Sequence, residues 1–339
     1  MSESKAMILG CAGKALTPDE IAFYRDERPW GFILFGRNIG EAGEIRDLVA
    51  AMRDSIGQPA APVFIDQEGG RVQRIRAPIA PNYPAGSALG AIYRSDQDVG
   101  VRATWLLSRL HAFDLAKLGI TADCLPVLDV PIEGASDVIG ARAYGSDPEA
   151  VTILGRAAAE GLIAGGVLPV MKHMPGHGRA FVDTHYELPI VDTPLDELRA
   201  HDFAPFKALN HLPMGMTAHV VFSAIDPTGP ATTSAKVVSE IIRGEIGFDG
   251  LLMSDDTSMK ALSGDFRQKA EAILAGGVDI VLHCNGVMEE MAEIAAGTGA
   301  LHGKSLQRAE AALQRLQQPD LTAEADLRAE FGQYFDMVA

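Results

Sequence analysis

The sequence contains little cysteine, little positive charge and no long apolar run. Its three cysteines among 339 residues (Cys11, Cys124 and Cys284) lie far apart and lack the CxxC spacing of zinc sites. A disulfide framework is therefore excluded, and a reducing compartment is expected. Lysine and arginine number 29 against 45 acidic residues, which gives a formal net charge of −16. Because such a surface repels phosphate backbones and anionic membranes, we expect neither nucleic acid nor a membrane as a partner.

No apolar run approaches the roughly 18 residues that a membrane-spanning helix requires. We therefore expect a soluble, cytoplasmic protein. The hydrophobic fraction of 47% is ample for a large core, and 339 residues allow one large domain or two small ones. Because no shift in composition, linker or repeat marks a boundary, we expect a single domain over residues 1–339.

Eight short apolar or β-branched runs alternate with stretches of helical spacing. The runs predict strands at residues 6–10, 31–35, 62–65, 120–124, 168–171, 214–217, 251–254 and 278–282. The helical stretches span residues 42–56, 96–118, 148–164, 194–210, 235–246 and 266–275. Eight strands alternating with helices favour a (β/α)8 barrel of the TIM type, an α/β fold, over a doubly wound sheet. The charged, mostly helical pattern of residues 301–339 predicts a closing helix or tail.

Charged side chains follow five of the predicted strands at the point where each strand ends. They are Asp66 and Arg74, Asp129 and Arg142, Lys172 and His173, His219, and Asp255 and Asp256. The carboxyl ends of barrel strands meet at one face, where barrel enzymes bind their substrates. The pattern therefore predicts a functional site at that face.

A polar loop follows the fifth predicted strand. Residues 172–178 (KHMPGHG) and 183–185 (DTH) contain a lysine, three histidines and an aspartate, with proline and glycines that redirect the backbone. Gly176 and Gly178 would let the segment that carries His185 close over a substrate. Asp183, two residues before His185, is placed to bond one ring nitrogen, fix the tautomer and favour the cationic imidazole.

These residue types suggest hydrolysis of a polar substrate. An aspartate at a strand tip can attack a carbon that develops positive charge, such as the anomeric carbon of a sugar. Protonation of the leaving oxygen needs an acid that titrates near neutral pH, which histidine does without a large pKa shift. Hydroxyl-rich ligands also need several directional contacts, for which the candidates are Asp66, Arg74, Arg142, Lys172 and His173.

The same residues also have structural interpretations. Asp66 could cap a turn, and His219 could be a buried, hydrogen-bonded histidine. Asp255 or Asp256 could cap a following helix, and the arginines could be surface cations.

A metal site is a further alternative. His173, Asp183 and His185 are residue types that ligate metals. The sequence has no HxH or HExxH spacing, however, and Lys172 beside His173 would repel a second cation. We therefore expect no metal.

The chain resembles glycoside hydrolase family 3 over nearly its whole length, specifically the single-domain bacterial β-N-acetylglucosaminidases of cell-wall recycling. The resemblance rests on residues 66–74 (DQEGGRVQR), 126–130 (PVLDV), 172–178, 183–185, and 248–250 (FDG) leading to 254–256 (SDD). Two positions depart from the usual pattern. Met174 stands where phenylalanine is common, and residues 140–144 read GARAY rather than the commoner GERSY.

The resemblance implies a retaining, two-step hydrolase that needs no cofactor. Asp255 matches the nucleophile that forms the glycosyl-enzyme, and His185 matches an acid/base that works with Asp183 as a dyad. The positions that hold the N-acetylglucosamine hydroxyls are matched by Asp66, Arg74, Arg142, Lys172 and His173. The implied substrate is a terminal β-linked N-acetylglucosamine on 1,6-anhydro-N-acetylmuramic acid, with or without peptide, and the implied enzyme is a monomer.

Three other functions stay open. A phosphorylase on the same scaffold is the nearest, because a histidine acid/base would not repel an incoming phosphate. The others are a non-catalytic muropeptide-binding protein and a metal-dependent barrel hydrolase.

Overall fold

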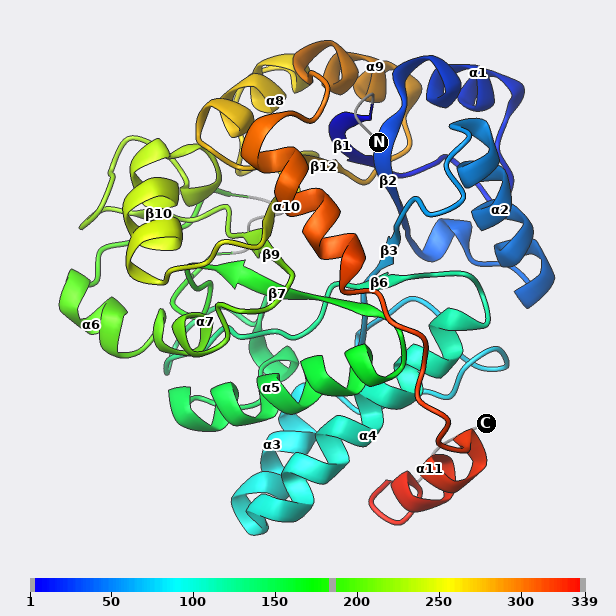
Figure 1. Ribbon diagram of the computed structural model, residues 1–339. Coiled ribbons are helices and arrows are strands. Elements are labelled where there is room, and N and C mark those ends of the chain that lie inside the picture. Colours follow the sequence, from blue (N-terminus) through cyan, green and yellow to red (C-terminus); the bar gives the residue numbers. More distant parts are fainter. Residues whose placement is uncertain (1–3, 183–186, 336–339) are drawn as a thin grey trace.

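The computed structural model describes residues 4–182 and 187–335, and its main feature is a closed barrel of parallel strands. The barrel strands are β1 (Lys5–Leu9), β2 (Pro29–Leu34), β3 (Val63–Ile65), β6 (Ala122–Asp123), β7 (Leu168–Met174), β9 (Met214–Thr217), β11 (Leu251–Asp256) and β12 (Ile280–His283). Around the barrel they follow the order β1-β12-β11-β9-β7-β6-β3-β2 (Figure 1). All eight predicted strands are confirmed, and so is the α/β barrel of the TIM type.

Helices surround the strands on the outside of the barrel (Figure 1). They are α1 (Pro18–Glu27), α2 (Ala42–Ser55), α3 (Gly86–Ser95), α4 (Gln97–Ala116), α5 (Pro148–Ala164), α6 (Leu195–Ala200), α7 (Ala204–Ala208), α8 (Phe266–Ala275), α9 (Met288–Gly297), α10 (Gly303–Gln314) and α11 (Glu324–Phe331). A π-helix spans Val237–Glu245. Outside the barrel, β4 (Gln67–Gly69) pairs with β5 (Val72–Gln73), and β8 (Ile190–Val191) pairs with β10 (Val221–Phe222).

The barrel strands are buried on both faces. Inside the barrel, side chains such as Ile8, Phe64 and Met253 pack together in one apolar cluster. The alternate side chains, such as Leu9 and Leu252, pack against the surrounding helices in a second cluster. Because neither face meets water, a barrel strand reads as a continuous apolar run rather than as an alternating one.

Local capping signals place the ends of several helices. The Asp147 carboxylate accepts hydrogen bonds from the first turn of α5, and Asp265 forms a capping box with Gln268 at the start of α8. Both helices agree with the prediction residue for residue. The predictions for α2 and α4 are confirmed to within two residues at each end.

Two helix predictions need correction. Residues 194–210 form two short helices, α6 and α7, rather than one. Pro205 has no N–H to donate to the carbonyl of His201, so a continuous helix cannot pass through this point. Residues 235–246 contain the π-helix instead of an α-helix. Helices α1, α3 and α9 were not among the predicted elements.

The C-terminal segment forms two helices rather than one closing helix. α10 crosses the amino ends of the strands, and its residues Ala309 and Ala312 join the apolar interior of the barrel. α11 packs against α4, where Glu330 forms an ion pair with Arg102 at 2.7 Å.

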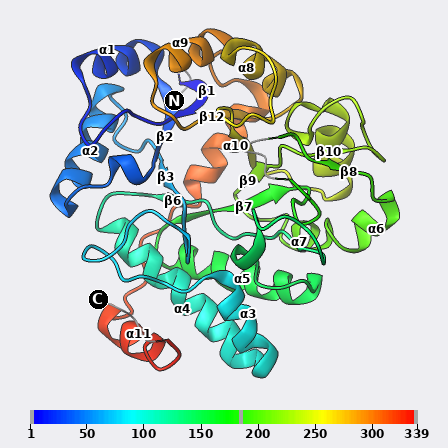
Figure 2. The same cartoon turned by 180° about the vertical axis from the view of Figure 1, so that it is seen from behind.

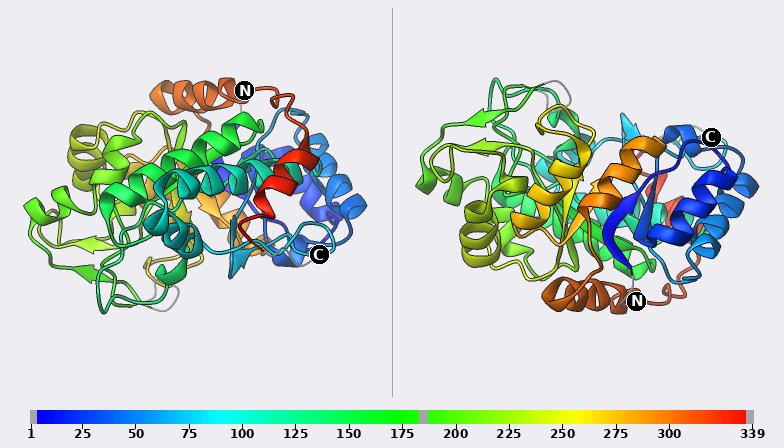
Figure 3. Two further views of the ribbon diagram at one scale, coloured as in Figure 1. Left: turned by 90° about the horizontal axis from the view of Figure 1, so that it is seen from below. Right: turned by 90° about the horizontal axis from the view of Figure 1, so that it is seen from above.

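α10 marks which end of the barrel each view presents. It lies in front of the barrel in Figure 1 and behind it in Figure 2, so Figure 2 looks onto the carboxyl ends of the strands. The side views of Figure 3 show α10, in orange, along one end. Within residues 4–182 and 187–335, no helix combines the length and apolar character needed to cross a bilayer.

Candidate active site

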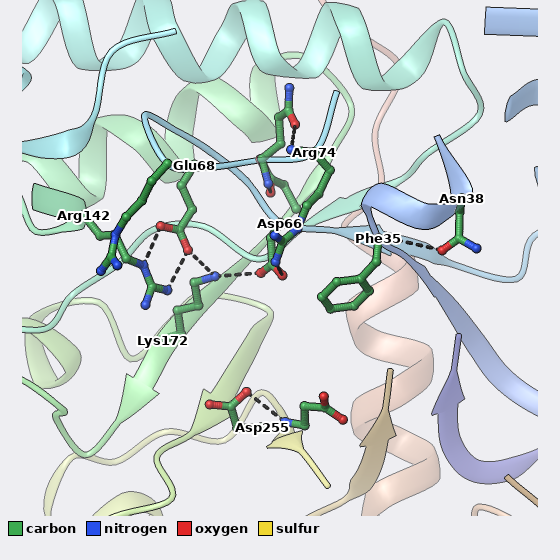
Figure 4. Close-up of polar contacts among 12 residues, drawn as sticks. Phe35, Asn38, Asp66, Glu68, Arg74, Arg142, Lys172 and Asp255 are labelled. Carbon is green, nitrogen blue, oxygen red and sulfur yellow. Dashed lines mark hydrogen bonds and ion pairs between the residues drawn. The ribbon is translucent and has the colours of Figure 1, made fainter. Parts of the chain in front are cut away.

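Five charged side chains of alternating sign form a continuous chain at the carboxyl ends of the strands (Figure 4). Arg74 donates to Asp66 at 2.9 Å, and Asp66 accepts from the ammonium of Lys172, also at 2.9 Å. Lys172 lies 2.6 Å from Glu68 as well. The Nε and Nη2 atoms of Arg142 each donate to the Glu68 carboxylate at 2.8 Å. The barrel thus brings together residues that lie up to 106 positions apart in the sequence, from Asp66 to Lys172.

Mutual attraction keeps this chain ionised despite its burial. Burial alone would raise the pKa of Glu68, but the charges of Arg142 and Lys172 outweigh burial and lower this pKa to about 2. Burial opposes the ionisation of Asp66 in the same way, and Lys172 and Arg74 hold its pKa below the usual range. For Lys172, burial would lower the pKa, but the two carboxylates raise it. At neutral pH the cations therefore present charged N–H donors at fixed positions.

A second buried carboxylate, that of Asp129, fixes the start of the polar loop. Its Oδ2 accepts the Nδ1–H of His173 at 2.6 Å, and its Oδ1 accepts the backbone N–H of His177 at 2.7 Å. Burial would raise the pKa of Asp129, but His173 lowers it to about 2. Because the carboxylate can only accept, Nδ1 of His173 carries the hydrogen, and Nε2 is left for a ligand.

Asp255 lies at the end of β11 and is almost fully buried. Its Oδ1 accepts the backbone N–H of Asp256 at 2.8 Å. Burial opposes its ionisation, but the nearby His173 and this backbone hydrogen bond lower its pKa below the usual value. Asp255 is therefore an anion at neutral pH, as a nucleophile must be.

The neighbouring Asp256 has a structural part. Its carboxylate accepts the backbone N–H groups of Ser258 and Cys284, each at 3.1 Å, together with the hydroxyl of Ser258. Residues 257–262 form turns and bends rather than a helix, so Asp256 closes a turn instead of capping a helix. The helix-cap interpretation is thus wrong for both aspartates.

His219 is a buried histidine with both ring nitrogens bonded. Nε2–H donates to the carbonyl of Asp256 at 3.1 Å, which leaves Nδ1 to accept from the hydroxyl of Thr232 at 2.7 Å. Burial lowers its pKa, which agrees with a neutral ring. The structural interpretation of His219 is confirmed.

These groups surround one cavity. Its wall includes all five predicted binding residues and Asp255, together with His177 and the apolar side chains of Phe35, Met216 and Met259. In Figure 4, Asp255 lies across from the chain of five charges. Charged donors and acceptors around an apolar floor suit a ligand with many hydroxyl groups. A larger groove of about 430 Å³, between α10 and the starts of β9 and β11, lies at the opposite end of the barrel from the predicted site residues that the structure describes.

Two predicted residues, Asp183 and His185, lie outside the described residues. In the part of the chain that the structure describes, no group of three or more His, Cys, Asp or Glu side chains is arranged to hold a metal ion.

The glycines of the loop have a packing role. A Cβ atom on Gly178 would lie 2.0 Å from the carbonyl oxygen of Val130. Gly176 has a φ of +144°, which side chains rarely adopt. The close approach of the two backbones is thus sufficient to explain why residue 178 is a glycine. Movement of the loop, which the sequence suggested, is not needed to explain it.

Three residues of the site received no role from the sequence: Glu68, Asp129 and His177. Glu68 could have been found from its spacing, because it follows Asp66 by two residues and extended chains direct such pairs to one face. The sequence placed Asp129 at a strand end and His177 in the polar loop, but it gave no sign of their contact, because that contact joins two different strand ends.

Comparison with known proteins shows the family to which the chain belongs. The model of the glycosyl hydrolase family 3 N-terminal domain matches residues 25–318. The β-hexosaminidase of Alkalilimnicola ehrlichii is 38% identical over 283 residues, which cover 82% of this chain and 80% of that protein. The crystal structure of native NagZ from Neisseria gonorrhoeae superimposes with a TM-score of 0.85 at 31% identity, covering 98% of this chain and 96% of that one. A complex of NagZ from the same organism with N-trifluoroacetyl-D-glucosamine matches equally well.

The chain therefore belongs to glycosyl hydrolase family 3, and it is a glycoside hydrolase. Within the family it is an enzyme of the β-hexosaminidase type.

Proposed function

We propose that the chain is a retaining exo-β-N-acetylglucosaminidase that removes terminal β-linked N-acetylglucosamine from 1,6-anhydro-N-acetylmuramic acid in cell-wall recycling. The observation that carries this proposal is the cavity in which an ionised Asp255 faces a chain of ionised hydrogen-bonding groups. The gonococcal NagZ complex with an N-acylated glucosamine supports an amino sugar as the bound group.

The proposed reaction has two steps. In the first, the Asp255 carboxylate attacks the anomeric carbon while His185 protonates the glycosidic oxygen, so the C–O bond breaks and a glycosyl-aspartate forms. In the second, His185 takes a proton from water, which attacks the same carbon and releases the sugar with retained configuration. Asp183 aligns the imidazole and stabilises its cationic form. The sugar hydroxyls are held by Asp66, Arg74, Arg142, Lys172 and His173.

The remaining parts of the proposal concern the setting of the enzyme. We propose that it works as a single domain, as a cytoplasmic monomer without a cofactor, and that peptide-bearing muropeptides are among its substrates. Its net charge of −16 supports the absence of nucleic acid and anionic membrane among its partners.

The first test is release of 4-nitrophenol from the N-acetyl-β-glucosaminide and from the matching β-glucoside, with and without EDTA and phosphate. We expect chelator-insensitive release from the N-acetyl substrate alone, with free sugar as the product. Sugar 1-phosphate as the product would establish a phosphorylase. No release from either substrate would favour a muropeptide-binding protein.

Two variants test the assigned residues. Asp255→Asn should lower kcat roughly 10³-fold or more, because no glycosyl-enzyme can form. His185→Ala should impair the natural disaccharide far more than the nitrophenyl substrate in the first step, because nitrophenol leaves without protonation. Equal losses on both substrates would contradict the acid role of His185.

A further inference from the structure

Glu68 holds two binding residues while standing behind the cavity. The described wall of the cavity includes Arg142 and Lys172 but not Glu68. Glu68 is only 5% exposed, and its carboxylate meets both cations at the same time. Any influence of Glu68 on a ligand must therefore pass through its two partners.

The geometry of the contact with Arg142 fixes a direction as well as a charge. Nε donates to Oε2 and Nη2 donates to Oε1, so two parallel hydrogen bonds set the plane of the guanidinium. Nη1 donates to the carbonyl of Val138 at 3.1 Å. With three of its five N–H groups engaged, Arg142 retains two for a ligand.

The contact with Lys172 completes the support. Its ammonium lies 2.6 Å from Oε1 of Glu68 and 2.9 Å from Asp66, and the side chain is fully buried. One of its three N–H donors is left for a ligand. A neutral side chain at position 68 would leave Arg142 and Lys172 to repel each other without a shared anion.

We propose that Glu68 is a positioning residue for sugar binding, which sets the directions in which Arg142 and Lys172 present their remaining donors. The inference rests on the proposed function, since it assumes that these two cations bind the sugar. Because the pKa of Glu68 is lowered to about 2, its carboxylate stays charged over the pH range in which the enzyme works.

The test is Glu68→Gln, assayed with 4-nitrophenyl N-acetyl-β-glucosaminide. We expect KM to rise about 10- to 100-fold, with a smaller change in kcat, because hydrogen bonds to charged groups weaken while Asp255 is untouched. Asp279→Asn is the matched control. Asp279 is a buried carboxylate held by Arg243 at 2.6 Å and Arg308 at 3.1 Å, but it lies at the amino end of β12. Its variant should lose stability and keep its KM.

A double-mutant cycle separates positioning from general damage. If Glu68 acts through Arg142, Glu68→Gln should raise KM much less in an Arg142→Ala background than in the wild type. Fully additive effects, or an unchanged KM in Glu68→Gln, would overturn the inference.

A second variant covers the case in which Glu68→Gln does not fold. If Glu68→Gln does not fold, Glu68→Asp keeps the charge but withdraws it by one methylene, so a raised KM is expected and a wild-type KM overturns the inference. If the wild-type chain releases no sugar, the proposed function and this inference are both refuted. If the wild type is active and the Glu68 variant has an unchanged KM, only the inference is refuted.

Discussion

Replacing Lys172 by methionine removes a buried cation from between two carboxylates, the half-buried Asp66 and the buried Glu68. The ammonium lies 2.9 Å from Asp66 and 2.6 Å from Glu68, and the methionine side chain has a similar length and volume. The substitution therefore leaves the packing nearly intact and isolates the loss of charge.

The expected loss of stability is large. At an effective dielectric constant near 20, each ion pair at this distance is worth about 6 kcal/mol before desolvation is counted. Desolvation of each ion costs several kcal/mol, and breaking a buried pair has a net cost of about 3–5 kcal/mol because the remaining charge is stranded. In Lys172→Met, Asp66 and Glu68 each keep one arginine, so we expect a loss near the lower end of that range at pH 7.

The pH dependence identifies the cause. In the wild type, the pKa of Glu68 is lowered to about 2, so its contribution is present above the unfolded pKa near 4.3 and is lost as the pH falls toward 2. Without the lysine, the two carboxylates repel each other and their pKa values rise. The variant can then relieve the repulsion by binding a proton in mild acid. The difference in the free energy of unfolding between wild type and variant should therefore be smaller at pH 4.5 than at pH 7.

Urea unfolding at the two pH values measures this gap, and Lys269→Met is the control. The ammonium of Lys269 donates to the carbonyl of Thr257 at 2.9 Å rather than to a carboxylate. Its removal should cost about 1 kcal/mol, to the same extent at both pH values. A Lys172→Met variant with a loss below 1 kcal/mol, or with the same loss at both pH values, would refute the reasoning.

Two further predictions concern the polar loop. Gly178→Ala should destabilise the fold by about 1–3 kcal/mol in urea unfolding, because the new Cβ would lie 2.0 Å from the carbonyl oxygen of Val130. Gly13→Ala is the control, and it should change stability little because the space around its Cβ is open. Equal effects of the two substitutions would contradict this packing. Burial lowers the pKa of His177 to about 4, so the unfolded chain binds a proton below pH 6.5 that the folded chain does not, and stability falls between pH 6.5 and 4. Between pH 7 and pH 5, the free energy of unfolding should therefore fall less in His177→Phe than in the wild type. An equal fall in the two proteins would show that His177 is charged in the folded state.

The barrel was predictable because its strands are buried on both faces. Such strands are continuous apolar runs, and each of the eight was found within a few residues of its place. The sequence also carried a signal for the break between α6 and α7, because Pro205, at the start of α7, cannot continue a helix from residues before it. Helical spacing on both sides of the break nevertheless favoured one element. Helix α1 begins with a capping box of Thr17 and Glu20, which is a signal in the sequence. The helix was not predicted because its apolar residues show no clear helical spacing.

The sequence predicted many residues of the site, but not which of them are in contact. Charged residues directly after buried strands must gather at the carboxyl end of a barrel, and most of those predicted from the sequence line one cavity there. Asp129 and His219 are exceptions, because neither belongs to the cavity wall. Which carboxylate meets which cation depends on strand order and register, so the double contact of Glu68 was not visible in the sequence. The neighbours Asp255 and Asp256 likewise share one motif, yet their carboxylates have different partners. Asp255 accepts the backbone N–H of Asp256, whereas Asp256 closes a turn through Ser258.

By itself, the sequence determined the strands, their alternation with helices, and the charged residues at the strand ends, because each depends on patterns within a few neighbouring positions. Only the tertiary structure decided that Lys172 lies between Asp66 and Glu68, that Arg142 is held by two hydrogen bonds, and that Gly178 meets a backbone from another strand end. Those contacts join segments tens of residues apart. Their geometry exists only once the barrel has closed and its register has set which side chains share a face.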